Sequence, residues 1–315
     1  MEAIRRKDYY LSIAGLVIFA ALSAGRDVFA KELFKQSKMR PAFATFFICI
    51  VSWIIFYVTA SVARKGPYLF DDFRRASREI KVLVYWSNVL TLIGFLTALM
   101  AIDATNAYVS ALIDYGGSPI ITALLAMAIL RETSSRGALI GLSVSLVGVI
   151  MLVGGLVGGT EVKISARESV IGTLCAIVSA VAFGLNQVVN KRLVVYGLVR
   201  EKLWLLRLPL AVVVLGVFAV TKGMPDLDSW AVLVVWAAVG TTAPLFLLVF
   251  AFEHLRVSNI ASFLFLVPLF TFIGSWSFRH FSDAGIALYL ISGFLVMIGV
   301  FVTERFSYEA DDDGT

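Results

Sequence analysis

Ten apolar segments, each long enough to cross a bilayer as a helix, dominate the sequence. A hydrocarbon core of about 30 Å needs roughly 20 consecutive apolar residues at a rise of about 1.5 Å per residue. Charged clusters and turn residues separate segments of this kind at residues 10–30, 42–63, 83–102, 104–130, 137–157, 170–190, 203–221, 229–252, 257–278 and 284–303. The pattern predicts an all-α polytopic membrane protein with ten transmembrane helices.

The composition agrees with a membrane protein and argues against several other classes. Of the 315 residues 59% are hydrophobic and 16% are charged, and the mean hydropathy of +0.89 is too high for a soluble domain. The net charge of +5 comes from residues spread over short loops, so no nucleic-acid partner is indicated. Cys49 and Cys175 each lie inside an apolar run, which predicts neither a disulfide nor a metal site. No catalytic or phosphate-binding motif is found, so we expect no enzyme and no cofactor.

The distribution of basic residues predicts the orientation. One side of a ten-span protein would carry both termini and 17 Lys and Arg residues, and the opposite side would carry 8. The predicted location is the cell membrane (inner or plasma membrane), and the positive-inside rule places both termini on its cytoplasmic side.

The fourth segment has an unusual centre. Residues 114–119 place a carboxylate, two glycines and a proline inside an apolar stretch. Pro119 lacks a backbone donor and disfavours helix at Ser118, while Gly116 and Gly117 weaken the preceding turn. We therefore expect a kinked or broken helix near the bilayer midplane, a recurring feature of transporters, and a similar interruption at Pro268 in the ninth segment.

A polar stripe runs along the same fourth segment. Its members recur every four residues, so each is offset by only about 40° from the one before: Asn106, Ser110, Asp114, Ser118 and Thr122. Tyr108 and Tyr115 add phenol rings close to this face. Small polar residues also hold membrane helices together without binding a ligand. An Asp facing lipid, however, costs about 2.5 to 3.5 kcal/mol, which favours a substrate cavity. Its predicted lining is Asp114, Tyr115, Ser118, Tyr108, Ser110 and Asn106.

Further polar residues lie near the ends of other segments. Asn186 and Asn190 share a helix face and either line an inner vestibule or cap the sixth span. Arg26 and Asp27 either line the outer mouth or form a solvated helix end. Arg207 is expected to snorkel toward the membrane surface.

The chain repeats its layout after a glycine-rich linker near residue 158. A proline followed by an acidic residue and two spaced glycines occurs in each half: Pro119, Glu132, Gly141 and Gly148, then Pro268, Asp283, Gly293 and Gly299. Five spans per half is an odd number, so the second copy is inverted relative to the first. The predicted units are residues 1–158, residues 159–305 and an acidic cytoplasmic tail at 306–315.

This order of features resembles the drug/metabolite transporter superfamily, specifically its ten-helix EamA-type members. The resemblance extends from about Tyr10 to Thr303. It is carried by Pro119, Glu132, Gly141, Gly148, Pro268 and Gly299. The sequence departs from the family pattern in the displaced acidic residue after the second proline, Asp283, and in an extra turn before Pro119. The resemblance implies a secondary carrier, commonly an exporter of amino acids or related metabolites, that rocks two repeats around a central cavity.

Two functions from different classes follow. The first is a carrier of a small polar or zwitterionic metabolite, in which Asp114 holds a cationic group or exchanges a coupling proton. Sodium is the other coupling ion considered. A homodimer is compatible with the sequence. The alternative is a translocase (flippase) of a lipid-linked headgroup, in which basic inner loops gather phosphates and the aromatic ninth segment faces lipid chains.

Overall fold

The computed structural model is all-α across the residues it describes. These are residues 2–37, 39–64, 71–105, 107–130, 135–158, 166–197, 200–222, 230–255, 260, 263–277, 291–295, 297–299, 301–303 and 305–306. Each of the ten expected segments contains one or more helices, and no strand occurs within the ranges just given. Glu132, Asp283, Asn106 and nearly all of the expected acidic tail lie outside the described residues.

The first half contains five long helices and a short one. They are α1 (Glu2–Ser37), α2 (Pro41–Arg64), α3 (Asp71–Arg75), α4 (Arg78–Ala104), α5 (Ala107–Leu125) with the π-helix η1 (Ala126–Leu130), and α6 (Arg136–Gly158). Sequence signals mark several starts. Pro41 is the first residue of α2, where its missing N–H costs nothing, and the Ser77 side chain caps α4 by accepting a bond from the Ile80 N–H.

The second half repeats this order with more interruptions. It contains α7 (Ala166–Val195), α8 (Arg200–Arg207), α9 (Pro209–Lys222), α10 (Trp230–Ala237), the π-helix η3 (Ala238–Thr242), α11 (Ala243–His254) and α13 (Leu266–Ser277), followed by helical residues between 291 and 303. Pro209 separates α8 from α9, because proline disfavours helix at Leu208.

Five of the described helical stretches are long and apolar enough to cross a membrane: Asp8–Gln36, Pro41–Val62, Arg78–Ala104, Val170–Val195 and Trp230–His254. Shorter apolar helices occupy Arg136–Gly148, Pro209–Ala219, Leu266–Ser277 and Ile291–Thr303. Valine and isoleucine side chains are exposed on most of these helices, as expected for a surface that faces lipid chains.

Of the kink or break expected at Gly116, Gly117 and Pro119, the break is not found, since α5 is helical from Ala107 to Leu125. Membrane helices tolerate proline and glycine where neighbouring helices support the backbone. A Cβ atom on Gly117 would lie 3.2 Å from the Cβ of Ala180, so this glycine permits the close approach of α5 to α7. The irregular turn comes later, at η1. In the ninth segment, Phe265 is a turn residue and Pro268 stands in the first turn of α13, where no intrahelical donor is needed.

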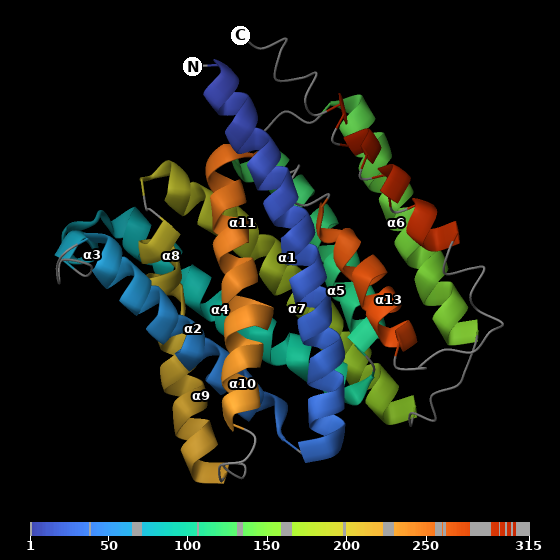
Figure 1. Ribbon diagram of the computed structural model, residues 1–315, viewed down its shortest axis with the longest axis horizontal. Helices are drawn as coiled ribbons and strands as arrows, with labels where there is room; N and C mark the ends of the chain where they lie inside the picture. The colour runs from blue at the N-terminus through green and yellow to red at the C-terminus, as the bar shows by residue number, and fades with distance from the viewer. Residues whose placement is uncertain are drawn as a thin grey trace.

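The helices of one half pack on those of the other in a reciprocal pattern. The first helix of the first half, α1, packs against α11 and α13, and the first helix of the second half, α7, packs against the corresponding α4 and α5. Counterparts also pack on each other, as α2 does on α9 and α5 on α13. Figure 1 shows α6 beside the last helical stretch, and Thr303 donates to the carbonyl of Ala138 at 3.3 Å. This reciprocity is that of two inverted five-helix repeats.

The bundle has an upper and a lower face. In Figure 1 the upper face is the one at which α1 begins and α11 ends, and the lower face is the one at which α1 ends and α10 begins. Helices α1 and α11 pack together as one two-helix unit, written α1–α11, and helices α4 and α7 as another, written α4–α7; each unit runs between these faces.

Candidate functional site

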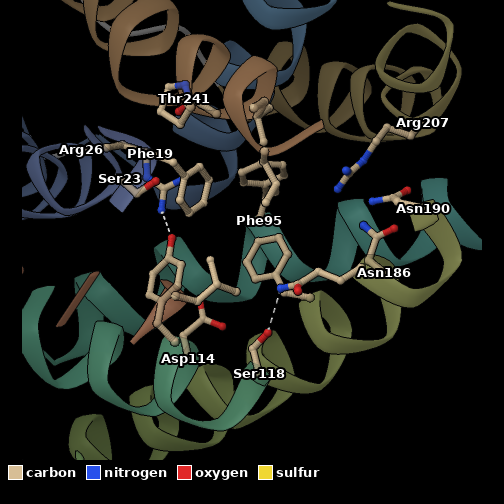
Figure 2. A pocket seen from close by; sticks show the side chains of 17 residues that line it. Phe19, Ser23, Arg26, Phe95, Asp114, Ser118, Asn186, Asn190, Arg207 and Thr241 are labelled. Atoms are coloured by element: carbon tan, nitrogen blue, oxygen red, sulfur yellow. Dashed lines mark hydrogen bonds between the residues drawn. The ribbon is translucent and has the colours of Figure 1, made fainter. Parts of the chain in front are cut away.

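A cavity of about 50 Å³ lies at the centre of the bundle, large enough for only a few water molecules. Both repeats contribute to it (Figure 2). Its lining consists of Phe19, Ser23, Arg26, Phe95, Asp114, Tyr115, Ser118, Phe183, Asn186, Gln187, Asn190, Arg207, Thr241, Pro244, Leu245, Leu248 and Leu264. Nine of these side chains carry polar or charged groups other than tyrosine, so the interior of an otherwise apolar bundle is polar.

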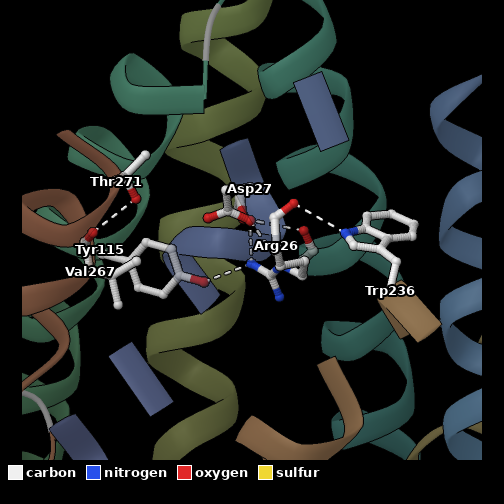
Figure 3. Close-up of polar contacts among 8 residues, drawn as sticks. Arg26, Asp27, Tyr115, Trp236, Val267 and Thr271 are labelled. Carbon is white, nitrogen blue, oxygen red and sulfur yellow. Dashed lines mark hydrogen bonds and ion pairs between the residues drawn. The ribbon is translucent and has the colours of Figure 1, made fainter. Parts of the chain in front are cut away.

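A charged network closes the cavity on the α1 side (Figure 3). The guanidinium of Arg26 pairs with the carboxylate of Asp27 at 2.6 Å and donates to the Tyr115 hydroxyl at 2.8 Å. The backbone carbonyl of Arg26 accepts from the Trp236 indole at 3.1 Å. Arg26 and Asp27 are both buried, so the pair is shielded from water and joins α1 to α5 and α10.

Three buried polar atoms that line the cavity have no hydrogen-bond partner within the part of the chain that the structure describes: Asp114 Oδ1, Gln187 Oε1 and Thr241 Oγ1. The other end of the Gln187 amide donates to Ser118 at 3.3 Å, which fixes its orientation. Buried polar atoms without partners are costly, and a cluster of them in one cavity calls for a ligand or water. The carboxylate and amide oxygens are acceptors, so a group that donates hydrogen bonds suits this side.

The opposite side of the cavity carries donors. The Arg207 Nε donates to Thr91 Oγ1 at 2.8 Å, and the Asn186 amide donates to the same oxygen at 2.9 Å. The Oδ1 atoms of Asn186 and Asn190 lie 3.0 Å from the Ser87 hydroxyl. Figure 2 shows the guanidinium of Arg207 and the amide nitrogen of Asn190 turned toward the interior of the cavity. These groups suit an anionic ligand group.

The structure brings part of the predicted site together. Asp114, Tyr115 and Ser118 line the cavity from α5, as Asn186 and Asn190 do from α7 and Arg26 from α1. Asp27 lies behind Arg26 as its ion-pair partner.

The other predicted binding residues do not reach the cavity. Tyr108 is buried against Phe272, with ring centroids 5.6 Å apart, and Ser110 is buried outside the lining. Tyr108 is not part of the four-residue stripe and packs on α13, whereas Ser110 lies one turn before Asp114. Asn106 lies outside the described residues.

Arg207 was expected to snorkel, and that expectation is wrong. Its side chain is only 3% exposed and lines the cavity. A single Arg near the end of an apolar segment is the signal that could have indicated this role, but the same pattern is usual for cations at the membrane surface. Gln187 and Thr241 were not predicted either, since isolated amides and hydroxyls are common in membrane helices.

Within the described residues, no group of three or more His, Cys, Asp and Glu side chains is close enough together to hold a metal ion.

Fold and cavity together define a polytopic helical membrane protein in which two inverted repeats enclose a polar centre. The chain belongs to the EamA-like transporter family, whose model matches residues 11–154 and again residues 170–305. It is therefore a membrane transporter of the drug/metabolite transporter superfamily. A solved structure titled "Crystal structure of protein" is similar in fold, with a TM-score of 0.70 at 15% identity over 97% of this chain and 99% of the other. A search of curated proteins gives no match.

Proposed function

We propose that the protein is a secondary carrier of small zwitterionic metabolites such as amino acids, working by alternating access around the central cavity. The observation that carries the proposal is the division of the cavity into an acceptor side, with Asp114 and Gln187, and a donor side, with Arg207 and Asn190. A zwitterion has an ammonium group for the first side and a carboxylate for the second.

Asp114 is the anchor for the ammonium group in this proposal. Among the described residues its buried Oδ1 atom has no hydrogen-bond partner, nor has the Oε1 atom of Gln187, which lines the same cavity. An ammonium group has three donors, enough for both oxygens. Without a ligand, Asp114 exchanges a proton or binds sodium in the proposed coupling step.

Arg207 is the counterpart for the carboxylate. Its Nε atom is held by Thr91, which fixes the plane of the guanidinium, and planar guanidinium groups bind carboxylates through paired hydrogen bonds. The Arg26 guanidinium, by contrast, is bound to Asp27 and Tyr115.

The cavity in this structure is smaller than such a ligand, so the structure corresponds to a contracted state in the proposed cycle. Opening toward either face would admit the substrate. On the basis of the basic loops, we propose that the upper face lies on the cytoplasmic side of the cell membrane. The proposed direction of transport is export.

The proposal is tested by thermal unfolding of the purified protein with amino acids, amines, carboxylates and nucleosides, since a ligand that binds the native state raises its stability. The Asp114→Asn variant should lose the stabilisation by amino acids and amines. The matched control is Asp8→Asn, the same chemical change near the start of α1 and outside the cavity lining. Retention of every ligand effect in Asp114→Asn, together with intact efflux from proteoliposomes, would contradict the assignment.

A lipid-linked headgroup translocase is the second candidate, favoured by one observation. An apolar groove of about 520 Å³ runs along α1 and α10 on the outside of the bundle, and Arg26 lines both this groove and the central cavity. A headgroup could enter there from the side while its chain stays in lipid. In that case no soluble zwitterion would stabilise the protein, and a labelled lipid would change leaflets in liposomes.

A further inference from the structure

Two lysines bind the ends of helices across the central cavity, one at each face of the molecule. Near the lower face, the Lys31 ammonium on α1 donates to the carbonyl of Asp103 at 2.7 Å. Asp103 lies in the last turn of α4. Near the upper face, Lys191 on α7 donates to the carbonyls of Phe252 at 2.7 Å and Leu255 at 2.9 Å, at the end of α11.

Both lysines use the same chemistry. The last four carbonyls of a helix have no partner within the helix, and the helix dipole places partial negative charge there. A lysine ammonium near a helix C-terminus satisfies such carbonyls. The acceptors are backbone carbonyls at helix ends, so these bonds hold a helix end in place.

The two lysines also occupy equivalent places in the repeats. Lys31 lies 20 residues after the start of the first family match and Lys191 lies 21 residues after the start of the second. Each is on the first apolar segment of its half and binds the end of the third apolar segment of that half. Because the repeats are inverted, the two contacts lie at opposite faces (Figure 1).

The packing of the helices shows what each contact joins. Helices α1 and α11 pack together as one unit, and α4 and α7 pack together as the other. The cavity lies between them, with Ser23 and Pro244 from the first unit and Phe95 and Asn190 from the second. Lys31 ties the two units at the lower face, and Lys191 ties them at the upper face.

We infer that Lys31 and Lys191 are a symmetry-related pair of gate latches that open in turn during the transport cycle. The inference rests on the proposed carrier function and adds the contacts that control access. When the lower face opens, the unit α1–α11 moves away from the unit α4–α7 and the Lys31 contact breaks while the Lys191 contact holds. When the upper face opens, the reverse occurs. With both latches formed the cavity is contracted, as it is in this structure.

The test follows exposure at each face with single-cysteine reporters. Cys49 and Cys175 are first replaced by alanine. Ala30→Cys then reports on the lower face and Ala251→Cys on the upper, since both alanines are fully buried and each precedes a residue of the contact, Lys31 or Phe252, in the sequence. The readout is the rate at which a water-soluble maleimide modifies each cysteine in protein reconstituted into lipid nanodiscs. No transported substrate is needed.

Lys31→Met keeps an unbranched side chain and removes the ammonium. It should raise the modification rate of Ala30→Cys by about tenfold and leave that of Ala251→Cys unchanged or slower. About tenfold is the shift between the closed and the open lower face that loss of one charge-assisted hydrogen bond produces. Lys191→Met should do the opposite. Lys31→Arg and Lys191→Arg retain a donating cation and should restore slow modification. The control is Lys35→Met, an exposed lysine on the same helix as Lys31.

The inference is overturned if either methionine variant exposes both reporters equally, if neither exposes any, or if Lys35→Met has the same effect. The arginine variants show whether a methionine variant merely misfolds, because misfolding exposes both cysteines. Face-specific exposure without stabilisation by any zwitterion would support the latches and contradict the proposed substrate. Stabilisation by zwitterions without face-specific exposure would leave the carrier in place and contradict the latches.

Discussion

Thr91 holds together the donor side of the cavity. Its fully buried hydroxyl oxygen accepts from both Arg207 and Asn186. Thr91→Val keeps the shape of the side chain and removes this acceptor, so two buried donors lose a partner. We expect the free energy of unfolding to fall by about 1 to 3 kcal/mol and the binding of carboxylate-bearing ligands to weaken. Denaturant unfolding and ligand-induced shifts in Tm measure the two effects.

Thr97→Val is the matched control, on the same helix. The Thr97 hydroxyl bonds only to carbonyls of its own helix, so its loss should change the free energy of unfolding by no more than about 0.5 kcal/mol. Equal effects of the two substitutions would show that Thr91 does not organise Arg207.

Single residues differ in how clearly the sequence indicates their roles. Asp114 was predictable, because a carboxylate at the centre of an apolar segment is too costly to face lipid. Arg207 was not, because the burial of a cation near the end of a span depends on which helices surround it. Here α4 supplies Thr91 and the neighbouring turns of α7 supply Asn186 and Asn190. None of these partners is near Arg207 in sequence.

At the scale of helices, the contact of α5 with α7 depends on glycine. A Cβ atom at Gly184 would lie 2.9 Å from Ile121 Cγ2 and 3.1 Å from the carbonyl of Ser118, which belongs to the backbone of α5. Gly184→Ala therefore requires the two helices to separate, and overpacking of this kind costs about 1 to 3 kcal/mol. We expect a lower Tm and a weaker contact between Ser118 and Gln187, which lie in these helices.

Gly25→Ala on α1 provides the comparison, since a Cβ atom there would meet nothing within 4 Å. Alanine has the higher helix propensity, so this change should be neutral or stabilise the protein by up to about 1 kcal/mol. Loss of stability in Gly25→Ala as large as in Gly184→Ala would mean that helix packing is not the cause.

The helices were predicted better than their interruptions. Apolar length identified all ten segments, because the bilayer fixes the length of a spanning helix. Of the kink or break expected in α5, the break is not found, whereas π-helices appear at η1 and at η3, which Pro244 follows two residues later. Pro244 lacks the N–H that would bond to the Gly240 carbonyl. A Cβ atom at Gly240 would also lie 3.0 Å from Arg26 Cβ, so the irregular turn lies against a distant part of the chain. Contacts with residues distant in the sequence cannot be predicted from the helix propensity of the residues in the turn.

At the scale of the molecule, the duplication was visible in the sequence, but the pairing of helices was not. Repeated prolines and glycines indicated two halves, and an odd number of spans in each required inversion. The division into the units α1–α11 and α4–α7 crosses the boundary between the halves, so it follows from packing alone. A cavity between units of mixed origin explains why both repeats supply polar residues to it.

The inverted architecture also makes a prediction about topology. Helix α1 begins at the upper face, and α6 ends at the lower face (Figure 1). With 17 Lys and Arg residues on the predicted cytoplasmic side against 8 on the other, the upper face should lie in the cytoplasm. Epitope tags at the N- and C-termini should bind antibody only after the cells are permeabilised, whereas a tag inserted after Gly158 should be accessible without this step. Tags at the two termini on opposite sides would require an odd number of spans, and an odd number is incompatible with two inverted five-helix repeats.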